Sequence, residues 1–405
     1  MKWEKVKLGD IATCIQPGPF GSQLHNSDYS KEGTPIIMPK DIVGGAIVHS
    51  GLLKVSEEHV KRLSRHQVYE GNLMVARKGD VRKCAYITAN ENGWMTGSDC
   101  LKVVLDESKC YPKFIYYQLR SEHIGRWLEK VSIGATMPSL NTGLLSGIEM
   151  VFPPIEIQKQ IAGILSVYDD LIENNQKQIK LLEEAAQRLY KEWFVDLRFT
   201  GHENAEIVDG VPEGWNWCKL EDAIQLDPKV TLTKERMKQF IPMSALSTSS
   251  MVLDESQFTE TTSNSGSKFQ NGDTLLARIT PCLENGKTAY VSGLKSDEGA
   301  VDSTEYIVMR AKTINSYMVY LLARTDDFRQ SAINSMSGSD GRQRVKSDKL
   351  KMLDYLHPTS ELVEKFENVE KPIFEKIYRL SKQMQQAKQA RDLLLPKLMS
   401  GEVEV

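Results

Sequence analysis

The chain repeats its own sequence pattern once, about 204 residues apart, and this repeat limits the folds open to it. Lys7-Leu8 with Asp10 recurs as Lys219-Leu220 with Asp222, and Gly71 leading to Ala76-Arg77 recurs as Gly272 leading to Ala277-Arg278. The shared order of these matches argues against chance. Because the units of a solenoid run about 20–50 residues, a period this long predicts two globular domains, each followed by a long helix.

Proline and glycine clusters mark the boundaries between these parts. Pro153-Pro154 closes the first mixed segment, because proline cannot continue a strand ladder but is tolerated at a helix start. A run containing Gly201, Gly210, Pro212 and Gly214 reads as a link. The sequence therefore predicts a first domain over 1–152, a helix over 153–199, a linker over 200–214, a second domain over 215–358 and a C-terminal helix over 359–400.

The first domain has a mixed pattern of short strands and helices. Runs at 34–38, 72–76, 84–88 and 101–105 are rich in strand-forming residues and bounded by turn formers. Pro112–Arg126 has apolar residues at helical spacing and reads as one helix. The fold class expected is α+β, with two α/β domains separated by two long antiparallel coiled-coil helices in a pseudo-twofold internal repeat.

Two apolar seams predict the helix pair. Steps of three and four residues are typical of a coiled coil, and the polar Asn175 inside the first seam would cost stability and fix register. A helix of about 37 residues would be roughly 55 Å long, about sixteen base pairs of duplex. An ordinary dimerisation coiled coil is the alternative. The seams contain Ile161, Leu165, Tyr168, Ile172, Asn175, Ile179, Leu182, Leu189 and Trp193 in the first helix, and Phe366, Ile373, Ile377, Leu380, Met384, Leu394 and Leu398 in the second.

Three positions break the match between the seams. Leu165 corresponds to Glu370, and Arg391 takes the place of Ala186. Pro372 should kink or interrupt the second helix near its start.

Composition excludes several classes of protein. No apolar run approaches the roughly 18 residues that span a bilayer, so we expect a cytoplasmic protein with no membrane contact. The 6 cysteines are scattered without metal-ligand spacing, so no metal is expected. The net charge of −3 argues mildly against a non-specific nucleic-acid binder, but a local basic face would still allow a sequence-specific one.

Catalytic motifs are missing from the sequence. Gly286-Lys287-Thr288 resembles the end of a phosphate-binding loop, but Pro281 stands where the first glycine is needed. The chain contains no GxGxxG, HExxH or GxSxG pattern, and no Asn/Asp-Pro-Pro-Tyr/Phe tetrapeptide of a DNA amino-methyltransferase. We therefore expect no catalytic residues and no cofactor bound by this chain.

Basic residues cluster in loops of both domains. Arginine and lysine neutralise phosphates, and arginine, glutamine and asparagine pair with base edges. The alternative is that each is an ordinary solvated charge, or that Arg77 and Arg278 are structural residues at strand ends. The candidate DNA-binding residues are Arg77, Lys78, Arg82, Lys83, Arg278, Lys287, Arg342, Gln343, Arg344 and Lys346.

Five stretches together resemble the specificity subunit of type I restriction-modification systems. They lie in the same order along essentially the whole chain. They are Trp3 with Lys7–Ile11, the helix entry Pro153–Ala162, the helix end Leu189–Asp196, the second opening Gly210–Trp215 and the C-terminal Leu394–Glu402.

The resemblance implies a non-catalytic subunit with two target-recognition domains, each reading one half of a split DNA sequence. It implies double-stranded DNA, modification (methyltransferase) subunits, expected to be two, and a restriction (translocase and nuclease) subunit as partners. S-adenosylmethionine would be bound by the modification subunits, and the helices would set the spacer and dock those subunits. A coiled-coil scaffold and a single-chain DNA-modifying enzyme remain the alternatives.

Overall fold

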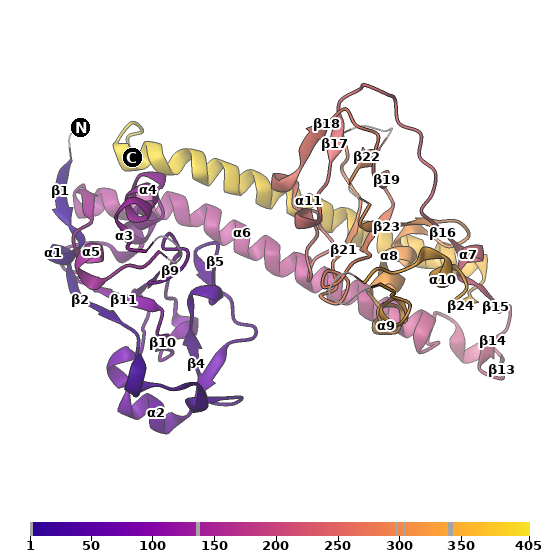
Figure 1. Cartoon of the computed structure of the whole chain (residues 1–405), viewed down its shortest axis with the longest axis horizontal. Coiled ribbons are helices and arrows are strands. Elements are labelled where there is room, and N and C mark those ends of the chain that lie inside the picture. Colours follow the sequence, from indigo (N-terminus) through magenta and orange to yellow (C-terminus); the bar gives the residue numbers. More distant parts are fainter. Residues whose placement is uncertain (1–2, 135–137, 296–298, 303, 339–342) are drawn as a thin grey trace. The chain divides into compact units, whose positions relative to one another are not determined.

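The computed structural model describes residues 3–405 except 135–137, 296–298, 303 and 339–342. Its contacts divide the chain into two compact units (Figure 1). Unit 1 contains Met1–Leu171 and Ala387–Val405, and unit 2 contains Ile172–Gln386. Each unit therefore holds one globular domain and a stretch of both long helices, α6 (Ile155–Tyr190) and α11 (Ser360–Ser400).

The globular domain of unit 1 is built on two four-stranded sheets. The first has the order β2-β11-β8-β9 and is antiparallel throughout, and the second has the order β10-β4-β7-β3. A two-stranded sheet joins β1 (Glu4–Lys7) to β12 (Glu149–Phe152), just before α6 begins. The strands are β2 (Ala12–Pro17), β3 (Tyr29–Ser30), β4 (Thr34–Ile37), β7 (Leu53–Val55), β8 (Leu73–Ala76), β9 (Cys84–Tyr86), β10 (Met95–Thr96) and β11 (Cys100–Leu105).

The helices of unit 1 differ from the prediction at one point. The single helix predicted over 112–126 is wrong, because the structure has α3 (Pro112–Leu119) and α4 (Glu122–Val131). Ser121 separates them, and its hydroxyl accepts a hydrogen bond from the Ile124 N–H at 3.5 Å as the N-cap of α4. The smaller elements are α1 (Leu8–Ile11), β5 (Ile42–Val43), β6 (Ala46–Ile47), α2 (Glu57–Arg62) and α5 (Thr142–Ser146).

Unit 2 repeats the first of these sheets with the same strand order. The order β16-β23-β20-β21 corresponds to β2-β11-β8-β9, and a second sheet has the order β18-β17-β22-β19. The sheet β15-β24 corresponds to β1-β12 and leads into α11. The elements are β13 (Ile207–Val208), β14 (Val211–Pro212), β15 (Asn216–Lys219), α7 (Leu220–Ala223), β16 (Ile224–Leu226), β17 (Lys238–Phe240), β18 (Thr259–Thr261), β19 (Lys268–Phe269), β20 (Thr274–Ala277), β21 (Thr288–Tyr290), β22 (Ala300–Val301), β23 (Tyr306–Ala311), α8 (Ser316–Arg324), α9 (Asp326–Asn334), α10 (Ser347–Lys351) and β24 (Asp354–His357).

Within each unit, α6 and α11 run antiparallel. In unit 2 the Asn175 side-chain amide donates to the Gln383 side chain at 3.2 Å, and the Tyr190 ring lies 6.1 Å from that of Phe366. The α6 helix continues from Tyr190 into a π-helical turn, Lys191–Val195. The seam residues are all buried or half-buried, with the lowest exposure at Ile161, Leu165, Asn175, Phe366, Ile377 and Leu398.

A polar network joins the two helices in unit 1. The Arg391 guanidinium lies 2.7 Å from one carboxylate oxygen of Asp169, and the Tyr117 hydroxyl donates to the other at 2.7 Å. Arg120 lies 3.8 Å from the same carboxylate. The arginine that breaks the apolar seam is therefore neutralised across the helix pair and tied to α3.

The prediction that Pro372 interrupts the second long helix is wrong. The α11 helix is continuous from Ser360 to Ser400 although it contains both Pro372 and Pro396. Each proline removes one backbone hydrogen bond. The apolar residues around Pro372, including the fully buried Phe366 and the nearly buried Phe374, pack into the core of unit 2. We infer that this packing outweighs the missing bond.

Candidate nucleic-acid interface

In unit 1 an arginine at a strand end holds three segments together. Arg77 directly follows β8, and its N–H donates to the Asp99 carbonyl at 2.7 Å. Its own carbonyl accepts the Leu140 N–H at 2.8 Å, and Lys78 forms an isolated bridge with Ser139. The loop before α5 is thereby fixed beside the end of the strand.

Unit 2 contains the same arrangement. Arg278 directly follows β20, and its N–H donates to the Glu305 carbonyl at 3.0 Å. Its carbonyl accepts the Val345 N–H at 2.9 Å, and Ile279 forms an isolated bridge with Arg344. Because the same backbone bonds recur, Arg77 and Arg278 occupy corresponding places in the two domains.

Beside each of these arginines, an acidic side chain forms an ion pair with a neighbouring basic one. In unit 2 the Arg344 guanidinium binds both Glu305 carboxylate oxygens, at 2.7 and 3.0 Å, and these hydrogen bonds hold the pKa of Glu305 below its usual range. In unit 1 the Lys78 ammonium lies 3.0 Å from the Asp99 carboxylate. Each pair reduces the local positive charge but keeps a cation at the edge of the loop.

An exposed aromatic ring lies beside the arginine of unit 1. The Arg77 guanidinium carbon is 5.4 Å from the centre of the Phe20 ring, a cation–π distance. Phe20 is 53% exposed, which is unusual for so large an apolar side chain. It was not among the predicted site residues. Its placement between Gly18-Pro19 and Gly21 in a loop was the available signal.

A basic cavity lies beside the arginine of unit 2. It has a volume of about 560 Å³, and its lining includes Arg278, Lys229 and Lys268, the acidic Asp227 and the polar Thr304 and Tyr306. The Arg278 side chain donates one bond to the Val345 carbonyl at 3.0 Å, while its Nε is buried without a hydrogen-bond partner among the described residues. The two lysines were not predicted, because Lys229, in a loop, and Lys268, in β19, have no basic neighbour in the sequence.

The side chains of Arg82 and Lys83 in unit 1 bind other groups of the same domain. Arg82 forms ion pairs with Glu122 and Glu129 of α4, and the hydrogen bond to Glu122 raises the arginine pKa. The Lys83 ammonium donates to the Pro39 carbonyl at 3.1 Å. Both cations are therefore engaged inside their own domain.

The remaining candidates of unit 2 lie in varied surroundings. The Lys287 ammonium donates to the Met243 carbonyl at 2.8 Å, and the Gln343 carbonyl accepts the Thr280 N–H at 3.2 Å. Lys346 is exposed and forms no ion pair with any residue that the structure describes. Arg342 lies outside the described residues.

Two further searches bear on other kinds of site. Across the described part of the chain, histidine, cysteine and acidic side chains form no group of three that could hold a metal ion. Among the same residues, every helix is too short or too polar to cross a bilayer.

Comparison with known proteins identifies a group of relatives. Residues 1–184 match the family model of the type I restriction modification DNA specificity domain. The type I restriction enzyme MjaIX specificity subunit of Methanocaldococcus jannaschii is 25% identical over 100% of this chain and 94% of its own length. The EcoAI specificity subunit of Escherichia coli is 34% identical, over 33% of this chain and 24% of its own.

A solved structure shares the fold. The S subunit of a type I restriction-modification system from M. genitalium aligns over 98% of this chain and 96% of its own, with a TM-score of 0.59 and 16% sequence identity. The fold of two domains and two long helices is therefore one that has been observed before.

Proposed function

We propose that this chain, which is similar to type I restriction-modification specificity subunits, acts as such a subunit and that each of its globular domains reads one half of a bipartite DNA target. The observation that supports this most directly is the recurrence of one backbone arrangement, around Arg77 and around Arg278, in two domains with different side chains. A shared scaffold with different surroundings suits two unlike half-sites.

The two domains offer different chemistry at the corresponding place. Unit 1 presents an aromatic ring over an arginine, Phe20 and Arg77, which suits contact with a base or a sugar edge. Unit 2 presents Lys229, Lys268 and Arg278 around a cavity, which suits a backbone phosphate. We propose that these two surfaces are the main DNA contacts, and that Arg82, Lys83 and Lys287 contribute less because their side chains are held within the protein.

The proposed partners rest on the similarity to specificity subunits. We propose that modification subunits, two per chain, dock on the long helices, bind S-adenosylmethionine and methylate adenine. A separate restriction subunit would cleave and translocate the DNA, and the helices would set the spacer between the half-sites. The complex would act in the cytoplasm.

Methylome sequencing of cells with and without this gene tests the proposal. Loss of the gene should erase one bipartite methyladenine motif and leave the other methylation motifs in place. An unchanged methylome would rule the proposed function out. Methylation or cleavage of DNA by the purified chain alone would instead point to a single-chain enzyme.

A further inference from the structure

The two long helices end in a similar way, although α6 ends through a π-helical turn and α11 does not. A residue with left-handed backbone closes each of them, Leu197 with φ +56° and Gly401 with φ +73°. In both, the next residue donates its N–H back to the last turn, Arg198 to Glu192 at 2.7 Å and Glu402 to Lys397 at 3.0 Å. These matched ends align Phe199 with Val403, each two residues beyond the left-handed position.

In unit 2 this place is closed by aromatic packing. The Phe199 ring lies 5.4 Å from that of Trp215, and the Phe194 ring lies 6.0 Å from Trp215 on another side. Phe199 is 8% exposed and Trp215 is 7% exposed. The tryptophan is therefore covered by the chain's own side chains.

In unit 1 the corresponding place is open. Trp3 precedes Lys7-Leu8 by the same spacing as Trp215 precedes Lys219-Leu220. Its indole packs against Gly401, where an added Cβ would come within 3.2 Å of the ring. Val403 stands where Phe199 stands in unit 2 and remains 37% exposed. At this position a valine therefore replaces the aromatic ring that covers the tryptophan of unit 2.

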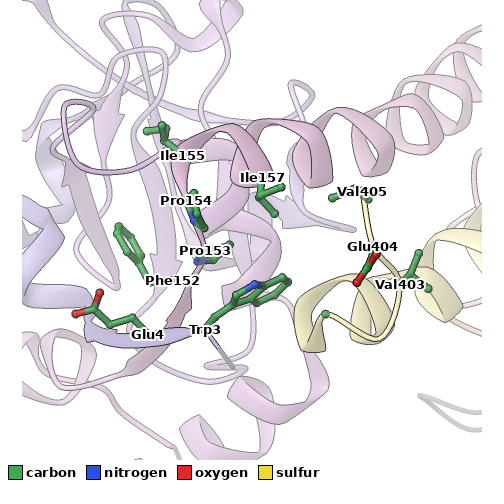
Figure 2. Close-up of a pocket in the computed structure, with 11 residues that line it drawn as sticks. Trp3, Glu4, Phe152, Pro153, Pro154, Ile155, Ile157, Val403, Glu404 and Val405 are labelled. Carbon is green, nitrogen blue, oxygen red and sulfur yellow. The ribbon is translucent and has the colours of Figure 1, made fainter. Parts of the chain in front are cut away.

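A cavity of about 660 Å³ lies beside Trp3 (Figure 2). Figure 2 shows the indole between the entry to α6 and the C-terminal segment. The lining is mainly apolar and includes Phe152, Pro153, Ile157 and Val403. A space of this size is larger than a single side chain needs and suits a short segment of a partner.

Among the described residues, the charged side chains that line this cavity are both acidic. Glu4 and Glu404 are exposed, and neither forms an ion pair with any described residue. Lys397, on the last turn of α11, is 3.8 Å from Glu402 and does not line the cavity. An apolar slot with an acidic rim is complementary to an apolar side chain carried on a basic segment.

We propose that this cavity, named here the Trp3 slot, is the docking site for an aromatic side chain flanked by lysine or arginine on a modification subunit. The aromatic group would cover Trp3 as Phe199 covers Trp215, and the basic flanks would approach Glu4 and Glu404. This inference rests on the proposed function, because that function supplies the partner.

A substitution that fills the slot tests the proposal. Val403→Phe places the residue of unit 2 in unit 1, and Val208→Phe makes the same change at an exposed site, 58% accessible, as the matched control. We expect Val403→Phe to raise the Tm of the chain by roughly 2–4 °C and to weaken binding of the purified modification subunit at least about tenfold. Val208→Phe should change neither quantity, and binding would be measured by titration calorimetry.

Photocrosslinking gives a second readout, which does not depend on whether the Val403→Phe variant folds correctly. With p-benzoylphenylalanine at position 403 of the assembled complex, we expect a crosslink to the modification subunit. The proposal is overturned if Val403→Phe binds that subunit as tightly as the wild-type chain does, or if position 403 yields crosslinks only within the chain. A wild-type chain that binds no modification subunit would overturn the proposed function itself.

Discussion

The proposed DNA contacts of the two domains can be tested at single residues. Arg77→Ala and Arg278→Ala each remove the cation at the corresponding strand end, and each should weaken binding of the assembled complex to its target by about 1–3 kcal/mol. Arg82→Ala removes a cation from the same domain as Arg77, but one that already pairs with Glu122 and Glu129, so target affinity should change little. Fluorescence anisotropy at a fixed salt concentration measures all three. Equal losses for Arg77→Ala and Arg82→Ala would contradict the assignment.

Recognition of these arginines from the sequence depended on the repeat. Arg77 and Arg278 stand out because each follows an equivalent strand. The sequence did not show that Phe20 lies beside Arg77 or Lys229 beside Arg278, because these pairs are far apart in sequence and only the fold brings them together. The ion pairs of Arg82 could not be predicted either. Its carboxylate partners lie on α4, and the apolar spacing did not show that α4 is separate from α3.

A buried acid in α11 makes stability depend on pH. Glu370 is 0% exposed, both its carboxylate oxygens lack hydrogen-bond partners in the described structure, and burial raises its pKa to about 7. The unfolded carboxyl ionises near its ordinary pKa of 4.5, so between these values the folded state holds the extra proton. The free energy of unfolding therefore falls as pH rises through this window, by about 3 kcal/mol in total.

Replacing this acid should remove that dependence. Glu370→Leu installs the residue type that Leu165 provides in the first helix, and its stability advantage over the wild-type chain should grow by about 3 kcal/mol between pH 4.5 and pH 8. Glu370→Gln should also flatten the pH profile but gain less, because a buried amide without partners remains costly. Urea denaturation at the two pH values provides the measurement. A wild-type pH profile in both variants would show that Glu370 does not titrate in this range.

At the scale of elements, the long helices were the most predictable part of the chain. Apolar residues at steps of three and four report a buried face directly. Two polar exceptions, Glu370 and Arg391, were also visible as breaks in the pattern. Their fates differ, because Arg391 meets Asp169 across the helix pair whereas Glu370 meets no partner in the described structure. Sequence spacing shows that a polar residue interrupts the apolar seam, but it does not show which side chain, if any, pairs with that residue.

The proline inside α11 gives an element-scale prediction. Pro372 is exposed in the interior of the helix, so the carbonyl of Asn368 lacks its usual backbone donor. Pro372→Ala should restore that bond and raise the free energy of unfolding by about 1–3 kcal/mol. Pro154→Ala, just before α6 begins, should have a smaller effect because an N–H there has no acceptor within the helix. Thermal unfolding of both variants decides the matter, and a loss of stability in Pro372→Ala would mean that α11 requires the proline.

At the scale of the whole molecule, the pseudo-repeat separates what is shared from what varies. The sheet order, the strand-end arginines and the antiparallel helices recur in both units, whereas the surfaces beside Arg77 and Arg278 do not. A repeat of this kind allows the surfaces beside the two arginines to differ while the supporting sheet and helices remain the same. The net charge of −3 is compatible with the proposal, because a sequence-specific DNA-binding protein needs only a local basic face.

Exchange of one domain is the decisive whole-molecule prediction. A chimera in which residues 1–152 come from a relative keeps the first turns of α6 and all of unit 2 from this chain. Because Arg278, Lys229 and Lys268 stay in place, we expect the methylated motif in cells to change in one half-site and to keep the other. The reciprocal exchange of residues 215–358 should change the opposite half-site. If either chimera altered both half-sites, the two domains would not read DNA independently, and the corresponding backbone around the two arginines would reflect common descent alone.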